Sequence, residues 1–298
     1  MHQHNHSYSH VANSRIGWAF FLNVTFTIIE FIGGILTNST AIMADAVHDL
    51  GDSLSIGFAW FLSKVSEKGS NSEFTYGYRR LSLLGALING LVLIAGSIWV
   101  LTEAIPKLLQ PEMPVVEGML GLAVLGVIVN GVAAYKLSEG KTLNERVLNW
   151  HLLEDVLGWV AVLIVSIVLL FADWPILDPA LSILFTLYIL INVGKNLWHT
   201  IRLFLQAIPD KELSKSVYDN LKELEAVNSI HHLHLWSLDG EHHVLTAHLV
   251  LQNALSLEQQ AELKQSIAER LGKFELEHTT IELELSDEQC RDENKSQE

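Results

Sequence analysis

Cysteine is nearly absent from this 298-residue chain, because Cys290 is the only one. A single cysteine excludes an internal disulfide and a metal site built from cysteines. Basic residues are also scarce: 19 Lys and Arg stand against 34 Asp and Glu, for a formal net charge of −15. Most of the acidic residues lie beyond residue 207, and an acidic soluble region argues against nucleic acid as a partner. The first ten residues, MHQHNHSYSH, lack the basic start of a secretory signal peptide.

Apolar residues, in contrast, are abundant and come in long blocks. They make up 49% of the chain, and the mean hydropathy is +0.28. A bilayer core about 30 Å thick needs about 20 apolar residues per helix. Six blocks meet this length and are predicted to span a membrane: 16–36, 41–63, 81–105, 115–136, 147–171 and 176–200. Lys and Arg gather in alternate connections, and Lys107 alone lies on the opposite side. The positive-inside rule therefore places both termini in the cytoplasm.

The sequence predicts four parts. A flexible, histidine-containing tail covers 1–14, a six-helix transmembrane domain covers 15–206, a cytoplasmic α+β domain covers 207–286, and a disordered acidic tail covers 287–298. Periodicity in the third part predicts the order α-β-β-α-β, with elements at 212–225, 229–237, 243–251, 257–273 and the final HTTIELEL. Ser256 is the expected N-cap of the second helix, with Gln259 completing a capping box.

Strand alternation divides the side chains of this small sheet between two faces. The covered face is predicted to hold Leu233, Leu235, Leu245, Ala247, Leu249, Ile281, Leu283 and Leu285. The other face then carries His232, His234, Trp236, Thr246, His248, His278, Glu282 and Glu284. Such a face is either a solvated polar surface, a contact with a second subunit, or a metal site. Imidazole and carboxylate groups suit Zn²⁺ and similar divalent ions.

Residues 45–52, DAVHDLGD, place ionisable groups inside the second apolar block. Each charge at the centre of a membrane helix costs roughly 2.5–3.5 kcal/mol on insertion scales. No Lys or Arg lies between residues 16 and 63, so a buried salt bridge within these helices lacks its basic partner. The acidic groups must therefore face a wet cavity, bind a cation or carry protons.

The spacing of two histidines favours one of these roles, the binding of a cation. His48 precedes Asp52 by four residues, and His151 precedes Asp155 by four, so each pair shares one helix face. Two nitrogens and two oxygens from two packed helices can surround a Zn²⁺ ion tetrahedrally. Metal ions and protons compete for such ligands, which makes proton-coupled antiport the natural mechanism. Asp45, Asp49 and Glu154 are the alternative acidic candidates for ligands of this ion.

The motifs that carry these residues resemble the cation diffusion facilitator family, specifically its zinc-transporting members. They are NSTAIMADAVHDLGD at 38–52, FTYGYRRLSLLGALING at 74–90, HLLEDVLGW at 151–159, and IHHLHLWSL with LTAHLVL within 230–251. The resemblance implies a multi-pass protein of the inner, cytoplasmic membrane that exports Zn²⁺ in exchange for protons. Cd²⁺ or Co²⁺ are implied as tolerated substrates. It also implies a homodimer whose ferredoxin-like cytoplasmic domain binds zinc.

The resemblance also implies the metal ligands. The transport site maps onto His48, Asp52, His151 and Asp155, and the cytoplasmic site onto His231 or His232, His234, His248 and Glu284. Strand parity favours His232 over His231. The N-terminal histidines either collect metal or are incidental. Further polar residues in or near the helices are expected to form interhelical hydrogen bonds: Asn23, Glu30, Asn89, Asn130 and Asp178. For Asp178, which precedes Pro179, the alternative is that the pair only marks the start of the sixth helix.

Two other functions compete with transport. Zinc held by His and Asp can activate water, so a membrane metalloenzyme is conceivable, but four ligands leave no open position and no separate general base is evident. The chain could instead be a zinc sensor anchored by its membrane part. Two polar spans argue against a mere anchor, and we expect no enzymatic activity.

Overall fold

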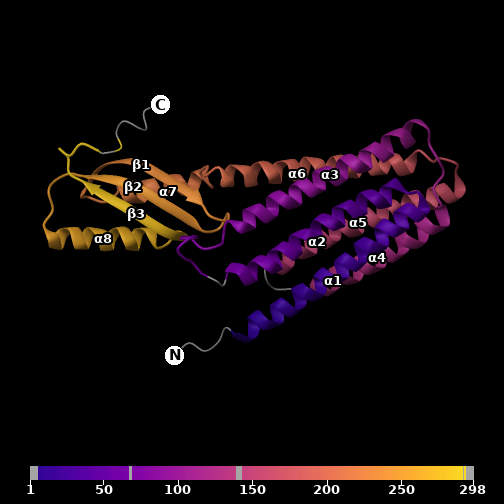
Figure 1. Ribbon diagram of the computed structural model, residues 1–298, viewed down its shortest axis with the longest axis horizontal. Helices are drawn as coiled ribbons and strands as arrows, with labels where there is room; N and C mark the ends of the chain where they lie inside the picture. Colours follow the sequence, from indigo (N-terminus) through magenta and orange to yellow (C-terminus); the bar gives the residue numbers. More distant parts are fainter. Residues whose placement is uncertain (1–5, 67–68, 139–142, 291, 293–298) are drawn as a thin grey trace. The chain divides into compact units, whose positions relative to one another are not determined.

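The computed structural model describes residues 6–66, 69–138, 143–290 and 292 (Figure 1). The chain divides into two compact units. The first comprises residues 1–65 and 85–197, and the second comprises residues 66–84 and 198–298.

Six long helices dominate the described residues. Their bounds are α1 His6–Thr37, α2 Thr40–Ser66, α3 Leu81–Leu109, α4 Val116–Ser138, α5 Leu143–Phe171 and α6 Leu177–Phe204. Helices α3, α4, α6 and the 152–171 part of α5 are long and apolar enough to cross a membrane. Many of their large apolar side chains are exposed, as at Ile128 and Leu184, which suits contact with lipid. The predicted helical membrane domain is confirmed.

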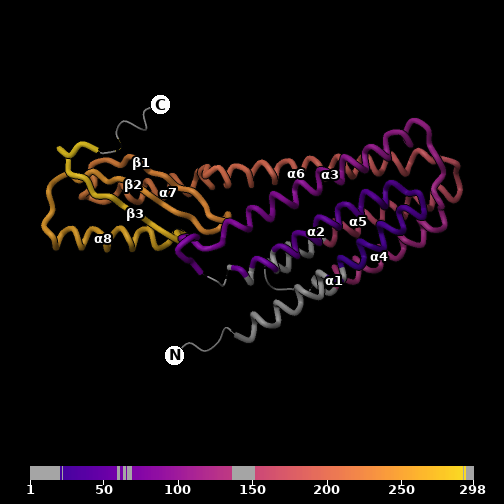
Figure 2. The backbone as a smooth tube through the Cα atoms, viewed as in Figure 1, coloured from indigo at the N-terminus to yellow at the C-terminus, as the bar shows by residue number. Residues whose placement is uncertain are grey.

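The interior of the first unit is packed around Trp159 of α5, which is fully buried. Its ring lies against Gly126 of α4, where an added Cβ would come within 2.1 Å of the indole. Phe26 of α1 contacts the same ring, with centroids 5.8 Å apart. Figure 2 shows α4 beside α5 and α1 beside α4, in agreement with these contacts. Glycine at position 126 therefore permits the close approach of α4 and α5.

The start of α2 is fixed by a carboxylate from another helix. Asp178, in the first turn of α6, accepts hydrogen bonds from Ser39 Oγ at 2.5 Å and from the Thr40 backbone N–H at 2.7 Å and Oγ1 at 2.9 Å. The Ala41 N–H donates to it at 3.3 Å. Asp178 therefore caps the N-terminus of α2 although it belongs to another helix, α6. The prediction that Asp178 bonds between helices is matched by these contacts.

The second unit contains an α+β domain. Its elements are α7 Lys211–Lys222, β1 Val227–Ser237, β2 His243–Leu251, α8 Leu257–Leu271 and β3 Leu276–Glu284. The sheet order is β1-β2-β3, with β1 antiparallel and β3 parallel to β2. The order α-β-β-α-β and the capping box at Ser256 and Gln259 are both confirmed.

Helices α7 and α8 cover one face of this sheet (Figure 1). The core between helices and sheet contains Val217 and Leu221 from α7, Leu263, Ile267 and Leu271 from α8, and Leu235, Leu245 and Leu249 from the strands. The alternation of leucines in the strands therefore selects the covered face, and the imidazole and carboxylate groups of the alternate positions are directed to the other face.

A bulge interrupts this alternation in β1. His231 pairs with His248, and His234 pairs with Thr246, so three steps along β1 match two along β2. The extra residue is absorbed at His232, whose φ of 46° lies in the left-handed region. As a result His231 lies on the same sheet face as His248. A continuous strand, which the parity argument assumed, would have put His231 on the leucine face instead.

Candidate metal centres

The first centre lies between α2 and α5. His48 and Asp52 occupy one face of α2, and their Nε2 and Oδ2 atoms are 3.7 Å apart. Asp155 of α5 approaches the same imidazole, with 3.8 Å between its Oδ1 and His48 Nε2. One ligand atom from each of the three residues lies within 4.8 Å of the others. Helical spacing thus aligns the first pair, and packing of α5 supplies the third donor.

The fourth predicted ligand is His151, which belongs to α5 one turn before Asp155. Its side chain lies outside the described residues. The same is true of the side chains of the N-terminal histidines, His2, His4, His6 and His10. The described residues therefore bring together three of the four predicted transport ligands.

A cavity of about 490 Å³ opens at this centre. Its polar lining includes His48 and Asp155, together with Asp45 and Glu154, and its remaining walls are formed by Leu157, Gly158, Leu184, Phe185, Tyr188 and Ile189. Glu154 is exposed in this lining and does not belong to the group of three donors. The centre is therefore open to a space that can hold water and a hydrated ion.

Further carboxylates surround the three donors. Glu30 of α1 is fully buried, and Asp45 and Asp49 of α2 are 6% and 4% exposed. These three residues interact electrostatically with one another and with Asp155. Asn23 Nδ2 donates to the Asp49 carbonyl oxygen and to Ser53 Oγ. With no Lys or Arg between residues 16 and 63, a bound cation or protons must balance this negative charge.

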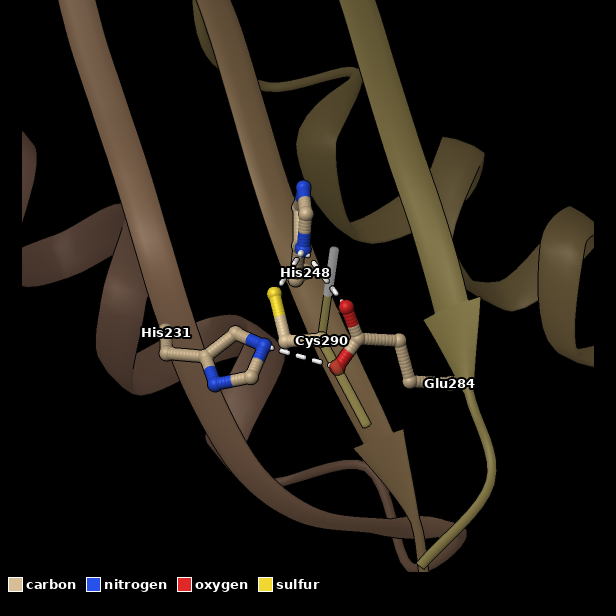
Figure 3. Close-up of side chains that lie close together, drawn as sticks. All are labelled: His231, His248, Glu284 and Cys290. Atoms are coloured by element: carbon tan, nitrogen blue, oxygen red, sulfur yellow. Dashed lines mark hydrogen bonds and ion pairs between the residues drawn. The ribbon is translucent and has the colours of Figure 1, made fainter. Parts of the chain in front are cut away.

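The second centre lies on the open face of the sheet formed by β1, β2 and β3 (Figure 3). His248 of β2 and Glu284 at the end of β3 are 2.6 Å apart between Nδ1 and Oε1. The other oxygen of Glu284 lies 2.8 Å from His231 Nε2 of β1. Cys290 Sγ lies 3.5 Å from His248 Nδ1. One ligand atom from each of these four residues lies within 4.8 Å of the others.

The pKa values of the Glu284 carboxyl and the Cys290 thiol in this centre are both shifted. Burial raises the pKa of Glu284, but hydrogen bonds with His248, Cys290 and His231 outweigh burial and hold that pKa below its usual range. Burial raises the pKa of the Cys290 thiol, and the nearby charges of Glu284 and Asp292 raise it further. Without metal, the centre therefore combines an anionic carboxylate with a neutral thiol.

The residues that the sequence analysis expected in this second metal site are only partly gathered here. His248 and Glu284 meet, but the imidazole that contacts Glu284 is that of His231. The His232 ring lies 5.1 Å from the His248 ring, centre to centre. His234 is exposed, with its ring 6.2 Å from that of His232. The bulge at His232 accounts for this arrangement.

Sequence reasoning missed Cys290 as a member of this centre. The residue lies in the segment 287–298 that was predicted to be disordered, and no pattern in SDEQCRDENKSQE indicates a ligand. A turn returns the chain instead: the Glu288 N–H donates to the Leu285 carbonyl oxygen at 3.0 Å, and Glu288 Oε2 accepts from the Leu285 N–H at 3.0 Å. Cys290 is consequently buried, at 9% exposure.

Comparison with known proteins matches two family models to the chain. Residues 18–205 match the cation efflux transmembrane domain, and residues 209–286 match the cytoplasmic domain of cation efflux proteins. The first model covers the helices that carry His48 and Asp155. The second covers the sheet that carries His231, His248 and Glu284, and it ends before Cys290.

Several curated proteins are similar over nearly their whole length. The cadmium, cobalt and zinc/H(+)-K(+) antiporter of Bacillus velezensis is 31% identical over 288 residues, which cover 95% of this chain and 92% of that protein. The zinc transporter ZitB of Pectobacterium atrosepticum is 34% identical over 299 residues, covering 98% and 91%. The metal cation efflux system protein CzcD of Cupriavidus metallidurans is 32% identical over 289 residues, covering 96% and 90%. The chain belongs to the cation efflux family, the cation diffusion facilitators.

Proposed function

We propose that this protein is a proton-coupled antiporter that exports Zn²⁺ from the cytoplasm. The observation that carries the proposal is the meeting of His48, Asp52 and Asp155, whose ligand atoms lie within 4.8 Å of one another beside an open cavity. One nitrogen and two oxygens form a donor set that suits Zn²⁺. The relatives named as zinc transporters and antiporters support the same function.

We assign His151 as the fourth ligand, because it precedes Asp155 by one helical turn as His48 precedes Asp52. The four ligands would then hold one ion in a tetrahedral shell. Zn²⁺ requires neutral imidazoles and ionised carboxylates, so protons that enter the site displace the metal. Exposure of the site to each side of the membrane in turn converts this competition into exchange of Zn²⁺ for H⁺.

Cd²⁺ and Co²⁺ are the expected alternative substrates. Both accept mixed nitrogen and oxygen ligands, and one relative is named for cadmium, cobalt and zinc together. Mg²⁺ and Ca²⁺ prefer shells of oxygen alone and are expected to bind poorly. We infer transport and no enzymatic turnover, since four protein ligands leave no position for an activated water.

The topology follows from the distribution of basic residues in the connections. We infer a location in the inner membrane with both termini in the cytoplasm. The cytoplasmic domain is proposed to hold two copies of the chain together and to bind a regulatory zinc ion. His248, Glu284 and the imidazole of His231 are the residues we assign to that ion, on the basis of their contacts.

Reconstituted vesicles test the proposed function. Purified protein is inserted into liposomes with an imposed pH gradient, and Zn²⁺ entry is followed with a trapped fluorescent indicator. We expect Asp155→Asn and His48→Ala each to reduce transport by at least about 10-fold to 100-fold, the loss typical of an outer-shell partner, because each changes a direct metal ligand. Glu154→Gln is the matched control, since Glu154 lines the same cavity outside the donor group. Gradient-driven Zn²⁺ entry that persists in the double variant would exclude this site.

A further inference from the structure

Cys290 is buried beside the second metal centre, although the segment that contains it is acidic and shows no pattern of a folded element. It is the one cysteine of the sequence, it is buried, and its Sγ faces His248 Nδ1 at 3.5 Å (Figure 3). The turn at Leu285 and Glu288 directs the chain back over the open face of the sheet. The thiol thus enters a group that already holds two imidazoles and a carboxylate.

We propose that Cys290 is a thiolate ligand of the cytoplasmic metal centre, and that His231, His248, Glu284 and Cys290 together bind one thiophilic divalent cation. This inference rests on the regulatory metal site of the proposed function and is independent of the transport site. On binding, a metal–sulfur bond forms and the thiol proton passes to solvent. The donor set is two nitrogens, one oxygen and one sulfur.

The arrangement of the four donors supports this assignment. Ligand atoms around a tetrahedral Zn²⁺ ion lie roughly 3.5 Å from one another, given metal–ligand bonds of about 2.0–2.3 Å. The contacts between neighbouring donors here are 2.6 Å, 2.8 Å and 3.5 Å. Small outward shifts of the side chains would therefore admit the ion, and metal–ligand bonds would replace the present hydrogen bonds.

Sulfur also determines which ions this centre prefers. Thiolate is a soft ligand that favours Zn²⁺ and Cd²⁺, whereas carboxylate and water suit Mg²⁺ and Mn²⁺. A centre with one thiolate is thus expected to reject the abundant hard cations. Because Cys290 follows β3 through a turn, its bond to the metal would also hold residues 285–290 against the sheet.

Cobalt spectroscopy of the full-length protein in detergent tests the proposal. The His48→Ala/Asp155→Asn background removes the transport site, so that the remaining binding reports on the cytoplasmic centre. With a reductant present, we expect one Co²⁺ per chain and a near-ultraviolet band from sulfur-to-cobalt charge transfer. Since Cys290 is the only cysteine in the sequence, this band identifies its ligand directly. The band is expected to vanish in Cys290→Ser.

Affinity and accessibility provide two further readouts. Cys290→Ser should weaken Cd²⁺ binding by at least about tenfold, measured by competition with a chelator. Bound Cd²⁺ should protect Cys290 from a maleimide, and His248→Ala should abolish that protection while leaving the free thiol reactive. His234→Ala is the matched control, because His234 is an exposed imidazole of β1 outside the four-residue group.

Three results would overturn the proposal. They are Co²⁺ binding without the charge-transfer band, an unchanged Cd²⁺ affinity in Cys290→Ser, and an absence of metal binding in the transport-site double variant. Vesicle transport by the protein with an intact transport site is measured separately. With Cys290 present, absence of the charge-transfer band alongside normal transport by the protein with an intact transport site therefore refutes the role of Cys290 alone. A normal band alongside an absence of transport by that same protein refutes the proposed transport function alone.

Discussion

His48 on α2 and Asp155 on α5 approach within 3.8 Å, between Nε2 and Oδ1, although the two residues are far apart in the chain. The contact joins one His-x-x-x-Asp motif to the other across two packed helices. Close to this contact, a Cβ added to Gly158 of α5 would lie 3.5 Å from Asp45 Oδ1 of α2. One residue before Trp159, Gly158 lies in the lining of the cavity with Asp45 and Asp155.

The choice of nitrogen at position 48 should determine metal preference. His48→Asp replaces an imidazole with a carboxylate, which is a harder ligand and suits Mn²⁺ better. We expect Zn²⁺ affinity to fall by about tenfold and the ratio of Mn²⁺ to Zn²⁺ transport to rise. Competition between the two ions in proteoliposomes measures this ratio. His199→Asp, outside both centres, provides the control, and an unchanged ratio in His48→Asp would show that His48 does not contact the transported ion.

Buried acidic residues near the transport site should destabilise the metal-free protein. Glu30 is fully buried and interacts electrostatically with Asp45. Glu30→Gln removes the possibility of a charge there, so we expect the metal-free protein to gain about 1–2 kcal/mol in stability. The stabilisation by Zn²⁺ should decrease at the same time, because the negative potential that attracts the ion is weaker. Thermal unfolding in detergent with and without Zn²⁺ checks both.

Glu117→Gln is the control for Glu30→Gln, since Glu117 is an exposed carboxylate in the first turn of α4. It should leave both unfolding temperatures nearly unchanged. Lower stability of the metal-free protein in Glu30→Gln would contradict the account, because it would show that the carboxylate at position 30 stabilises the packed helices.

Asp178 should stabilise the helix that carries His48. Its carboxylate accepts four hydrogen bonds from residues 39–41 at the start of α2. Asp178→Ala leaves these donors without their acceptor, and we expect a loss of about 2–3 kcal/mol in stability. Zinc transport should decline with it, since α2 also carries Asp52. Thermal unfolding and vesicle transport measure the two effects.

Asp173→Ala is the matched substitution for Asp178→Ala, because Asp173 is exposed and precedes α6. It should change stability by less than about 0.5 kcal/mol. Equal effects of the two substitutions would refute the role of Asp178 as a cap of α2.

Acid should weaken the turn between β1 and β2 through Asp239. Burial raises the pKa of Asp239, but hydrogen bonds from the His242 and Glu241 backbone N–H groups and from the His242 side chain outweigh it and lower the pKa below 3.8. Because the folded-state pKa is lowered, the stabilisation is complete above about pH 4 and is lost as pH falls through the folded-state value.

Comparison with Asp239→Asn isolates this charge, because asparagine retains an oxygen acceptor for the turn. Hydrogen exchange of residues 237–243 should show the wild-type turn more stable by about 1 kcal/mol at pH 7. The difference should begin to shrink once the pH falls below about 4, and it should vanish as the pH falls through the lowered folded-state pKa of Asp239, where the carboxyl becomes neutral. A difference that is constant with pH would mean that the charge of Asp239 contributes nothing.

Much of this protein followed from rules that act within a few residues. Apolar blocks of about 20 residues predicted the membrane helices, and alternating leucines predicted the covered face of the sheet. Ser256 and Gln259 predicted the start of α8 because a capping box is a local pattern. The four-residue spacing of His48 and Asp52 likewise placed both on one helix face before any packing was known.

Tertiary structure alone decided which distant groups meet. The bulge at His232 brings His231 to Glu284, and a turn beyond β3 brings Cys290 to His248. Neither has a sequence signal, since a bulge depends on the partner strand and the turn depends on the surface onto which the chain folds. Periodicity assigns a side chain to a face of its own element. Which neighbour that face meets depends on the packing energy of the whole chain.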